Sequence, residues 1–302
     1  MLSRELPLLE RHINFENEQL HVLTALYGAV VGAVSEADIE LCKSIELMKS
    51  STLILDDFLD ESPKRNGIAS IYAEQGAKTA VLTAELLKGV ASSKLIEILR
   101  TDARNYDKLA FLHVFEDTYA TICRGQMRDI SLAKIPILEY VPSEKDYFDL
   151  IGDTSACYIR APLLMGGIVM NLPKDVLTSL GDFGINIGLA YQIRDDVLDL
   201  VGDPENMGKP FAGDIREKKK RLPLIHHLSV EPRGLVRKIM TKPCLNDEDV
   251  IKVVEELRRT RSLQYCVDKI FYFKEEAMDS LSYKNNELAA IAELITNFQG
   301  GI

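Results

Sequence analysis

Residues 45–60 read IELMKSSTLILDDFLD, and residues 188–203 read GLAYQIRDDVLDLVGD. Each stretch has apolar residues at helical spacing, and each carries two adjacent aspartates followed by a third aspartate three positions later. Because an α-helix turns once every 3.6 residues, the first and third aspartates lie nearly in line and the second lies beside them. Both stretches are therefore predicted to be helices with three carboxylates on one side.

Three carboxylates crowded into one helical turn repel one another unless a cation lies between them. Mg²⁺ prefers such oxygen ligands, and it binds through one or two carboxylates together with substrate phosphates. A solvated helix end is the alternative explanation for one cluster. The repetition favours two facing helices that hold a metal–diphosphate group. The candidate ligands are Asp56, Asp57, Asp60, Asp195, Asp196 and Asp199.

The rest of the chain shows the same helical spacing. Ser35 is expected to cap the helix that ends at the first cluster, and no run alternates apolar and polar residues for long enough to require a strand. We find no flexible linker, internal repeat or low-complexity segment. The predicted fold class is all-α, a single-domain helical bundle over residues 1–302. Further helices are expected at residues 77–100, 108–133, 146–170, 180–203 and 246–281.

Composition excludes several classes of protein. The chain has 302 residues, is 46% hydrophobic and carries a net charge of −10. These values are typical of a soluble globular protein and argue against a nucleic-acid partner, which would require a basic face. The five cysteines are odd in number and form no CxxC pair, which favours a reducing compartment. The longest mainly apolar segment, residues 22–34, is too short to span a membrane. We expect a cytoplasmic protein with no transmembrane segment.

Cations follow each cluster. Lys64 and Arg65 lie in a turn that ends at Gly67, where they could reach a phosphate. Beyond the second cluster, Lys209 and Lys219 carry compact charges on flexible stems, which suit a diphosphate. The sequence therefore places positive charge beside both groups of aspartates.

Other polar residues have two interpretations. The charged run at residues 216–221 is typical of a solvated face, although its position after a cluster favours phosphate binding. Gln126 and Asp129 lie on an otherwise apolar helix and either contact metal-bound water or substrate, or are exposed. We expect His226 and His227 on a helix surface, without a catalytic role.

These motifs resemble those of the trans-isoprenyl diphosphate (polyprenyl) synthases, which have the class I isoprenoid synthase fold. The resemblance runs from about Ile39 to about Leu228. It includes both aspartate clusters, the turn with Arg65 and Gly67, the segment GQMRD, and GKP, D and K-x-x-L-P after the second cluster. It implies one isoprenoid synthase domain over residues 1–302, an all-α bundle with a central apolar cavity, in a homodimer.

The resemblance also implies a reaction. Three Mg²⁺ ions would bind the diphosphate of an allylic substrate, and the allylic cation would be attacked by isopentenyl diphosphate. Asp56, Asp60 and Asp195 would be the catalytic metal ligands, with Asp57, Asp196 and Asp199 around them. The residues that would bind the substrate diphosphates are Lys49, Arg65, Gln126, Lys209 and Lys219.

The sequence departs from the family pattern where isopentenyl diphosphate would bind. The family's Gly-Gly-Lys-Arg-x-Arg segment is replaced by INFENEQLHVL, which has Glu16 and Glu18 instead of cations. Lys49 replaces a His or Gln, and Asn66 replaces an Arg. The family's Lys-Thr pair falls on Thr154 and Ser155, or on Asp153 and Thr154 in the other register. Neither register supplies a lysine.

Three hypotheses about function follow. The first is an Mg²⁺-dependent prenyltransferase that elongates an allylic diphosphate with isopentenyl diphosphate. The second is a class I terpene synthase, or a prenyltransferase with another acceptor, that uses the allylic diphosphate without isopentenyl diphosphate. The third is a non-catalytic subunit of a heteromeric synthase, which the two complete aspartate clusters disfavour.

The residues before the first cluster predict a long product. Ser51 and Thr52 occupy positions where bulky aromatic side chains close the pocket in short-chain family members. Small residues there leave a tunnel for a product of twenty carbons or more, with Met48 and Ile45 lining the next turns. The alternative is that other helices close the tunnel first.

Overall fold

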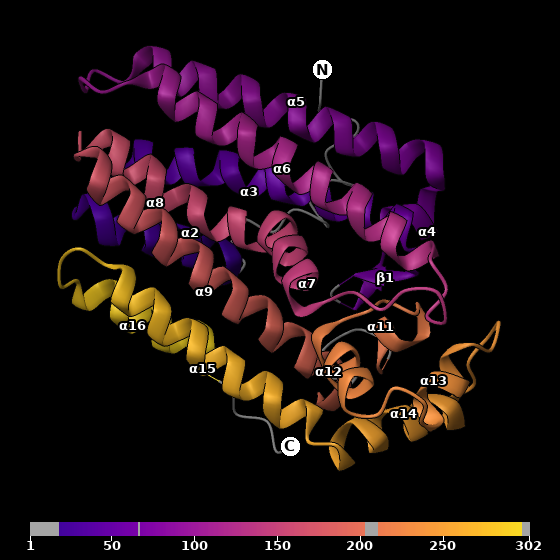
Figure 1. The fold of residues 1–302 in the computed structure, drawn as a ribbon. Coiled ribbons are helices and arrows are strands. Elements are labelled where there is room, and N and C mark those ends of the chain that lie inside the picture. The colour runs from indigo at the N-terminus through magenta and orange to yellow at the C-terminus, as the bar shows by residue number, and fades with distance from the viewer. Residues whose placement is uncertain (1–17, 66, 203–210, 298–302) are drawn as a thin grey trace.

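The computed structural model describes residues 18–65, 67–202 and 211–297, and Figure 1 shows that they form a bundle of helices. The all-α prediction is confirmed. The predictions for Glu16, Asn66 and Lys209 fall on residues outside the described ranges. The side chain of Glu18 is not described either. Within the described part of the chain, no helix combines the length and apolar character needed to cross a membrane.

The first half of the chain supplies one side of the bundle. α3 packs lengthwise against α5, and α6 lies beside them (Figure 1). The elements are α2 (Glu18–Val31), α3 (Glu36–Leu59), β1 (Lys64–Arg65), β2 (Ile68–Ala69), α4 (Ile71–Gln75), α5 (Ala77–Thr101) and α6 (Lys108–Lys134).

In the second half, α9 lies at the centre and packs against both α8 and α15 (Figure 1). The short helices α11 to α14 gather at one end of the molecule. The elements are α7 (Glu144–Ile151), the π-helical turn η2 (Gly152–Ala156), α8 (Cys157–Val169), α9 (Lys174–Val201), α11 (Gly213–Arg216), α12 (Leu222–Val230), α13 (Leu235–Met240), α14 (Asp247–Arg259), α15 (Ser262–Ser280) and α16 (Asn286–Thr296).

The helix that carries the first cluster begins where the sequence predicts. The Ser35 hydroxyl accepts a hydrogen bond from the Asp38 amide, and the Asp38 carboxylate accepts one from the Ser35 amide at 3.0 Å. This reciprocal pair is a capping box, which satisfies amide groups that have no partner within the helix. The main core then buries one side of α3 among apolar residues that include Tyr27, Phe111, Phe115 and Phe183.

A small hairpin follows the first cluster. Lys64 and Arg65 pair antiparallel with Ile68 and Ala69, and Gly67 has a positive φ of 79° that suits a glycine. Sequence analysis found no strand because two-residue strands are too short to produce an alternating pattern. The hairpin turns the chain back so that Arg65 reaches the aspartates.

A π-helical turn interrupts the helix formed by α7 and α8. Such a turn accommodates one extra residue in an α-helix, and η2 contains Asp153, Thr154 and Ser155. The ambiguity between two registers of the family's Lys-Thr pair falls within this turn. Gly188 on α9 lets the two segments approach closely, because a Cβ atom at Gly188 would lie 2.4 Å from the Ala156 Cα.

The expectation that His227 lies on a helix surface is wrong. Its side chain is fully buried, and its Nδ1 shares a hydrogen bond of 2.9 Å with the Thr260 hydroxyl. Burial lowers the pKa of His227 below its usual value. His226 is half-buried and stacks on the Tyr265 ring. Through these contacts, both histidines hold α12 against the end of α14 and the start of α15.

Replacing Gly188 with alanine is expected to lower the free energy of unfolding by about 1–3 kcal/mol, because the new methyl group overpacks the contact with Ala156. Gly89→Ala is the matched control. An added Cβ at this exposed position in α5 meets nothing within 4 Å, so we expect a gain of roughly 0.5–1 kcal/mol. Urea unfolding measures both. Equal stability of the two variants would contradict the close approach at Gly188.

Candidate active site

The first aspartate cluster is held by side chains from three other segments. The two Asp56 oxygens accept hydrogen bonds from Gln126 Nε2 at 2.7 Å and from Arg65 Nη2 at 2.9 Å. The same guanidinium donates to Asp57 Oδ1 from Nε and Nη2, at 2.9 and 2.7 Å. Lys219 Nζ contacts Asp60 Oδ2 at 2.5 Å. Arg65, Gln126 and Lys219 therefore meet at the first cluster, while their contacts with a substrate diphosphate stay a prediction.

The charges of these partners shift the pKa values of the carboxylates. Burial by itself would raise the pKa of Asp56, but the neighbouring Arg65 and Lys219 cations lower it below its usual value. Asp60 behaves differently. Burial and the negative charge of Asp56 raise the pKa of Asp60 to about 6, although Lys219 opposes the shift. The first cluster thus depends on protein cations to keep its carboxylates charged.

In the second cluster each aspartate has a different environment. Asp195 is half-buried and makes no hydrogen bond or ion pair with any residue that the structure describes. Asp196 is buried, and its two oxygens accept hydrogen bonds from Tyr147 and Gln192, both at 2.7 Å. Burial raises the pKa of Asp196 to about 7. Asp199 accepts hydrogen bonds of 3.2 Å from the amides at 213 and 214.

The segment of residues 211–221 connects the two clusters. At one end, the amide of residue 213 donates a hydrogen bond to Asp199. At the other end, Lys219 Nζ contacts the Asp60 carboxylate. Arg221 is largely buried and donates to both oxygens of Asp129, at 3.3 and 3.0 Å. Asp129, which the sequence left as either exposed or functional, is thus the ionic partner of the connecting segment.

The interpretation of the charged run as a solvated face is wrong at its C-terminal end. Lys220 is buried and donates to the carbonyls of Leu132 and Ile135 at 2.6 and 2.7 Å. Together with Lys219 and Arg221, it ties the segment to α3 and α6. Only Arg216, whose partner Asp247 is highly exposed, has the environment expected of a surface ion pair.

Lys49 lies on α3, seven residues before Asp56. Its Nζ is 5.2 Å from the centre of the Tyr158 ring, and burial lowers the pKa of this lysine. Asp153, in η2, has its carboxylate 3.4 Å from the Arg128 guanidinium. Ser155 donates to Gln192 at 2.6 Å. The π-helical turn contains no lysine, and Arg128 on α6 is the cation that pairs with Asp153.

The residues expected to line a product tunnel are all buried on α3. The Ser51 and Thr52 hydroxyls donate to the carbonyls of Met48 and Lys49, at 2.7 and 2.8 Å. Since their own helix satisfies these hydroxyls, they require no other partner from a hydrocarbon chain. Ile45 and Met48 continue the buried face. The central apolar cavity itself stays a prediction.

Sequence reasoning missed Tyr147 and gave Gln192 no role. Gln192 could have been found, because it lies one helical turn before Asp196 on the same face. Tyr147 gave no signal, since 49 residues separate it from the carboxylate that it contacts. Glu46 and Tyr158, which share a buried hydrogen bond, were missed for the same reason.

The donor chemistry fits a hard divalent cation. In the described ranges, no group of three or more His, Cys, Asp or Glu side chains converges on a single point. Mg²⁺ does not need such a group, because it retains water and binds through one or two carboxylates plus substrate phosphates. Asp195, which has no partner among the described residues, and the exchangeable contacts of Asp56 and Asp60 suit a metal that binds together with a diphosphate.

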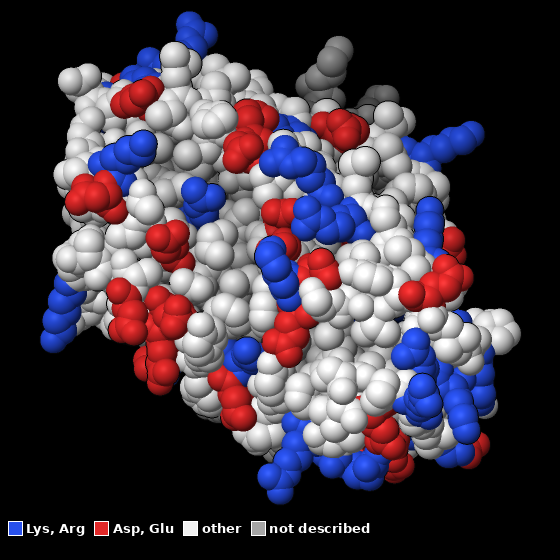
Figure 2. Space-filling view, viewed as in Figure 1, with Lys and Arg blue, Asp and Glu red and all other residues white. Residues whose placement is uncertain are grey.

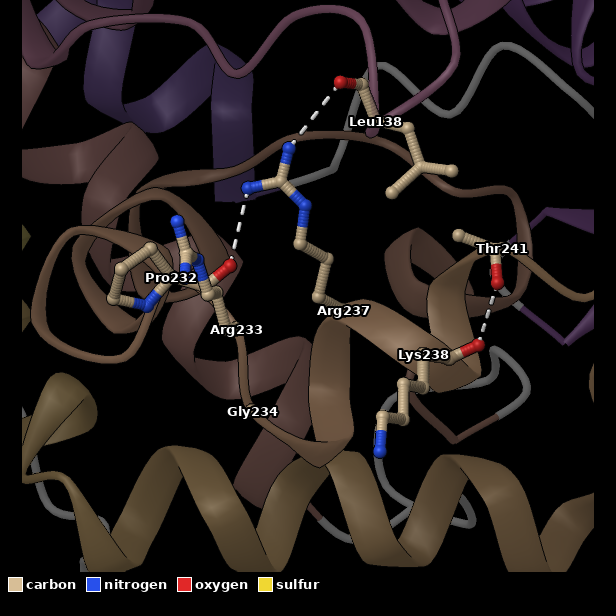
Figure 3. Close-up of a pocket in the computed structure, with 7 residues that line it drawn as sticks. All are labelled: Leu138, Pro232, Arg233, Gly234, Arg237, Lys238 and Thr241. Atoms are coloured by element: carbon tan, nitrogen blue, oxygen red, sulfur yellow. Dashed lines mark hydrogen bonds between the residues drawn. The ribbon is translucent and has the colours of Figure 1, made fainter.

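A separate hollow lies outside this site. It has a volume of about 510 Å³ at α13 and is lined by Arg233, Arg237 and Lys238 (Figure 3). Arg237 donates to the carbonyls of Pro232 and Leu138, so its guanidinium joins α13 to the loop after α6. Figure 2 shows basic side chains gathered over this end of the molecule. None of the lining residues belongs to either aspartate cluster.

An all-α bundle whose two D-D-x-x-D helices are connected by residues 211–221 agrees with the class I isoprenoid synthase fold that the motifs imply. The model of one family within this class, polyprenyl synthetase, matches residues 20–257. The chain belongs to the polyprenyl synthetase family.

Individual relatives agree with this assignment. The chain is 29% identical to the geranylgeranyl diphosphate synthase of Saccharolobus solfataricus over 255 residues, 83% of this chain and 75% of the relative. It is 31% identical to the short chain isoprenyl diphosphate synthase of Methanothermobacter thermautotrophicus over 281 residues, 90% and 83% of the two chains. The crystal structure of geranylgeranyl pyrophosphate synthetase from Pyrococcus horikoshii superposes with a TM-score of 0.81 at 25% identity, covering 98% of this chain and 89% of that one.

Replacing Arg221 with methionine is expected to lower the free energy of unfolding by about 3–5 kcal/mol, because it leaves the largely buried Asp129 carboxylate without its cation. Arg216→Met is the matched control within the same run. Its partner Asp247 is 85% exposed, so the loss should stay below about 1 kcal/mol. Urea unfolding of both variants measures the difference, and a small loss at Arg221 would show that it does not hold the connecting segment.

Proposed function

We propose that the protein is an Mg²⁺-dependent prenyltransferase that ionises an allylic diphosphate and condenses it with isopentenyl diphosphate, to give a product of twenty carbons or more. One observation carries the proposal. The segment at residues 211–221 links two aspartate clusters and places Lys219 at the first of them, beside Arg65 and Gln126. Relatives named geranylgeranyl diphosphate synthase and geranylfarnesyl diphosphate synthase support the activity and the product length.

Asp56, Asp60 and Asp195 would bind Mg²⁺ directly, and we expect three ions when diphosphate is bound. Bound Mg²⁺ supplies the positive charge that stabilises a departing diphosphate. Asp57 and Asp199 would support these ligands from beside them. Asp196 would act mainly as a support, since Tyr147 and Gln192 occupy its two oxygens.

The basic and amide side chains would bind the substrate diphosphates. Arg65, Lys219 and Gln126 contact carboxylate oxygens, and each can turn its donors towards a phosphate instead. Lys49 would contact the diphosphate of isopentenyl diphosphate, and Lys209 is proposed from the sequence alone. These contacts would hold the two substrates in order while the surrounding helices exclude water from the cation.

The proposed reaction forms one carbon–carbon bond. The allylic C–O bond breaks and diphosphate leaves with the electron pair. The double bond of isopentenyl diphosphate then attacks the allylic carbon, and a proton is lost from the new cation. The oxygens of the departed diphosphate are the proposed base, because Mg²⁺ would occupy the carboxylates of the clusters.

A second candidate is a reaction of the allylic diphosphate alone, as in a class I terpene synthase. One observation favours it. The π-helical turn Gly152–Ala156 supplies no lysine, although the family pattern places one there. Isopentenyl diphosphate would then meet fewer cations than in a typical family member.

Release of diphosphate from geranyl, farnesyl and geranylgeranyl diphosphates in the presence of Mg²⁺ separates the two candidates. We expect release only when isopentenyl diphosphate is added, together with a product at least one isoprene unit longer. Malachite green after pyrophosphatase treatment measures release, and mass spectrometry identifies the product. Release without isopentenyl diphosphate would instead favour the second candidate.

Asp56→Ala and Asp195→Ala should each reduce turnover by more than about 1000-fold, because contacts to a catalytic metal supply several kcal/mol of transition-state stabilisation. Asp117→Ala is the matched control. This exposed aspartate on α6 contacts only Arg124 at the surface, so its loss should leave turnover unchanged. Steady-state assays at saturating Mg²⁺ measure all three. Full activity of either cluster variant would exclude that residue as a metal ligand.

Ser51→Phe should shorten the product, because an aromatic ring in place of a fully buried small side chain fills the proposed tunnel. We expect the main product to lose at least one isoprene unit. Ser51→Ala, which leaves the tunnel open, should give the wild-type product. Chromatography of the dephosphorylated products reports the change, and an unaltered product from Ser51→Phe would place the tunnel elsewhere.

We further propose that the protein is a homodimer in the cytoplasm. Leu82, Leu86 and Ile96 share one exposed face of α5, and Leu109 and Met127 share one exposed face of α6. These faces are apolar surface that a second copy would cover. The five free cysteines support a reducing compartment.

A further inference from the structure

Three polar side chains form a group inside the bundle beyond the first aspartate cluster. Glu46 and Lys49 lie one helical turn apart on α3, and Tyr158 reaches them from α8. The Tyr158 hydroxyl donates to Glu46 Oε2 at 2.7 Å, and both residues are almost completely buried. The Lys49 ammonium lies 5.2 Å from the centre of the Tyr158 ring.

The contacts within this group fix the position of the Lys49 ammonium. Burial and the Glu46 carboxylate raise the pKa of Tyr158 well above its usual value, so the phenol keeps its proton and its hydrogen bond. The hydrogen bond sets the orientation of the ring. The face of the ring then attracts the ammonium by a cation–π interaction. Glu46 therefore acts on Lys49 through the tyrosine, in addition to the direct attraction between its carboxylate and the ammonium.

This arrangement leaves the donors of Lys49 available. Within the described part of the chain, its ammonium makes no hydrogen bond and no ion pair. A ring face attracts positive charge without accepting a conventional hydrogen bond from each N–H group. A phosphate could thus accept those hydrogen bonds while the ring contact is kept.

The position of Lys49 suits an anchor for a second diphosphate. It lies seven residues, about two turns, before Asp56, and thus on the same face of α3. Asp56 and Arg65 both influence its pKa, so the ammonium lies within electrostatic reach of the first cluster. In the π-helical turn, which packs against α6 and α9, Thr154 and Ser155 carry no positive charge.

We propose that Glu46 and Tyr158 are positioning residues that hold the Lys49 ammonium where it binds the diphosphate of isopentenyl diphosphate. The inference rests on the proposed function, because it assumes that this substrate is used. It adds a device by which the chain compensates for cations that its relatives carry elsewhere in the site.

The test is a double-mutant cycle read in KM for isopentenyl diphosphate. Lys49→Met should raise this KM by about 100-fold, and Tyr158→Leu by about 10-fold, while KM for the allylic diphosphate and kcat change less than about 3-fold. The double variant should match Lys49→Met, since the tyrosine acts through the lysine. Additive effects, or an unchanged KM in Tyr158→Leu, would overturn the proposal.

Two conservative variants test the role of the hydrogen bond with less risk of unfolding the protein. Tyr158→Phe keeps the ring but loses the hydrogen bond to Glu46, and it should raise KM for isopentenyl diphosphate by roughly 3-fold to 10-fold. Glu46→Gln keeps an acceptor for the Tyr158 hydroxyl, so its KM for isopentenyl diphosphate should stay within about 3-fold of the wild-type value. A wild-type KM in Tyr158→Phe, or a KM in Glu46→Gln as high as in Tyr158→Leu, would contradict positioning by the hydrogen bond.

Tyr27→Phe is the matched structural control. Tyr27 is fully buried and donates to the carboxylate of Asp38 on α3 at 2.7 Å, as Tyr158 does to Glu46, but no lysine of the described residues lies over its ring. It should lower the melting temperature about as much as Tyr158→Phe without changing KM for isopentenyl diphosphate. An equal rise of KM in Tyr27→Phe would show that the effect is only structural.

The same assay distinguishes failure of the inference from failure of the proposed function. If the wild-type enzyme turns over allylic diphosphates without any requirement for isopentenyl diphosphate, both are wrong. If it elongates with isopentenyl diphosphate but the Tyr158 variants keep the wild-type KM, only the inference is wrong.

Discussion

Repulsion among the carboxylates at the end of α3 is the constraint on which the site depends. Three aspartates within one turn cannot all stay charged in a partly buried position unless cations face them. Arg65 and Lys219 supply that charge, from a hairpin just after the helix and from a segment beyond α9. Neutralising the cluster therefore brings distant parts of the chain to one end of the bundle.

This requirement for cations explains why several hydrogen bonds and ion pairs hold the connecting segment, residues 211–221, in place. Lys219 can face Asp60 only if residues 211–221 are held, and Asp199, Asp129 and two backbone carbonyls hold them. In the proposed reaction the same cations would exchange carboxylate oxygens for phosphate oxygens, and the carboxylates would hold Mg²⁺. Asp195, which has no partner among the described residues, would need no such exchange. The two clusters would then differ in how readily they accept a metal.

Sequence reasoning predicted what periodicity and spacing determine. The cap at Ser35 and the all-α class are found in the structure. The contacts of Arg65, Gln126 and Lys219 with the first cluster are compatible with the diphosphate contacts that the family resemblance implies, which stay a prediction. Sequence reasoning failed where a buried polar group meets a partner far along the chain, as in Tyr147 with Asp196. It also failed at Lys220, because a hydrophilic run gives no sign that folding will bury it. At His227 it overlooked the apolar neighbours in LPLIHHLSV, which indicate a buried helix.

Calorimetric titration of Mg²⁺ into the wild-type protein, with and without inorganic diphosphate, tests the central claim most directly. If protein cations occupy the first cluster until a diphosphate attracts them, Mg²⁺ should bind weakly by itself and at least about 10-fold more tightly with saturating diphosphate. Diphosphate should gain affinity from Mg²⁺ by the same factor, because coupling between two ligands is reciprocal. Equal Mg²⁺ affinity in the two titrations would contradict the exchange of cations at the aspartates.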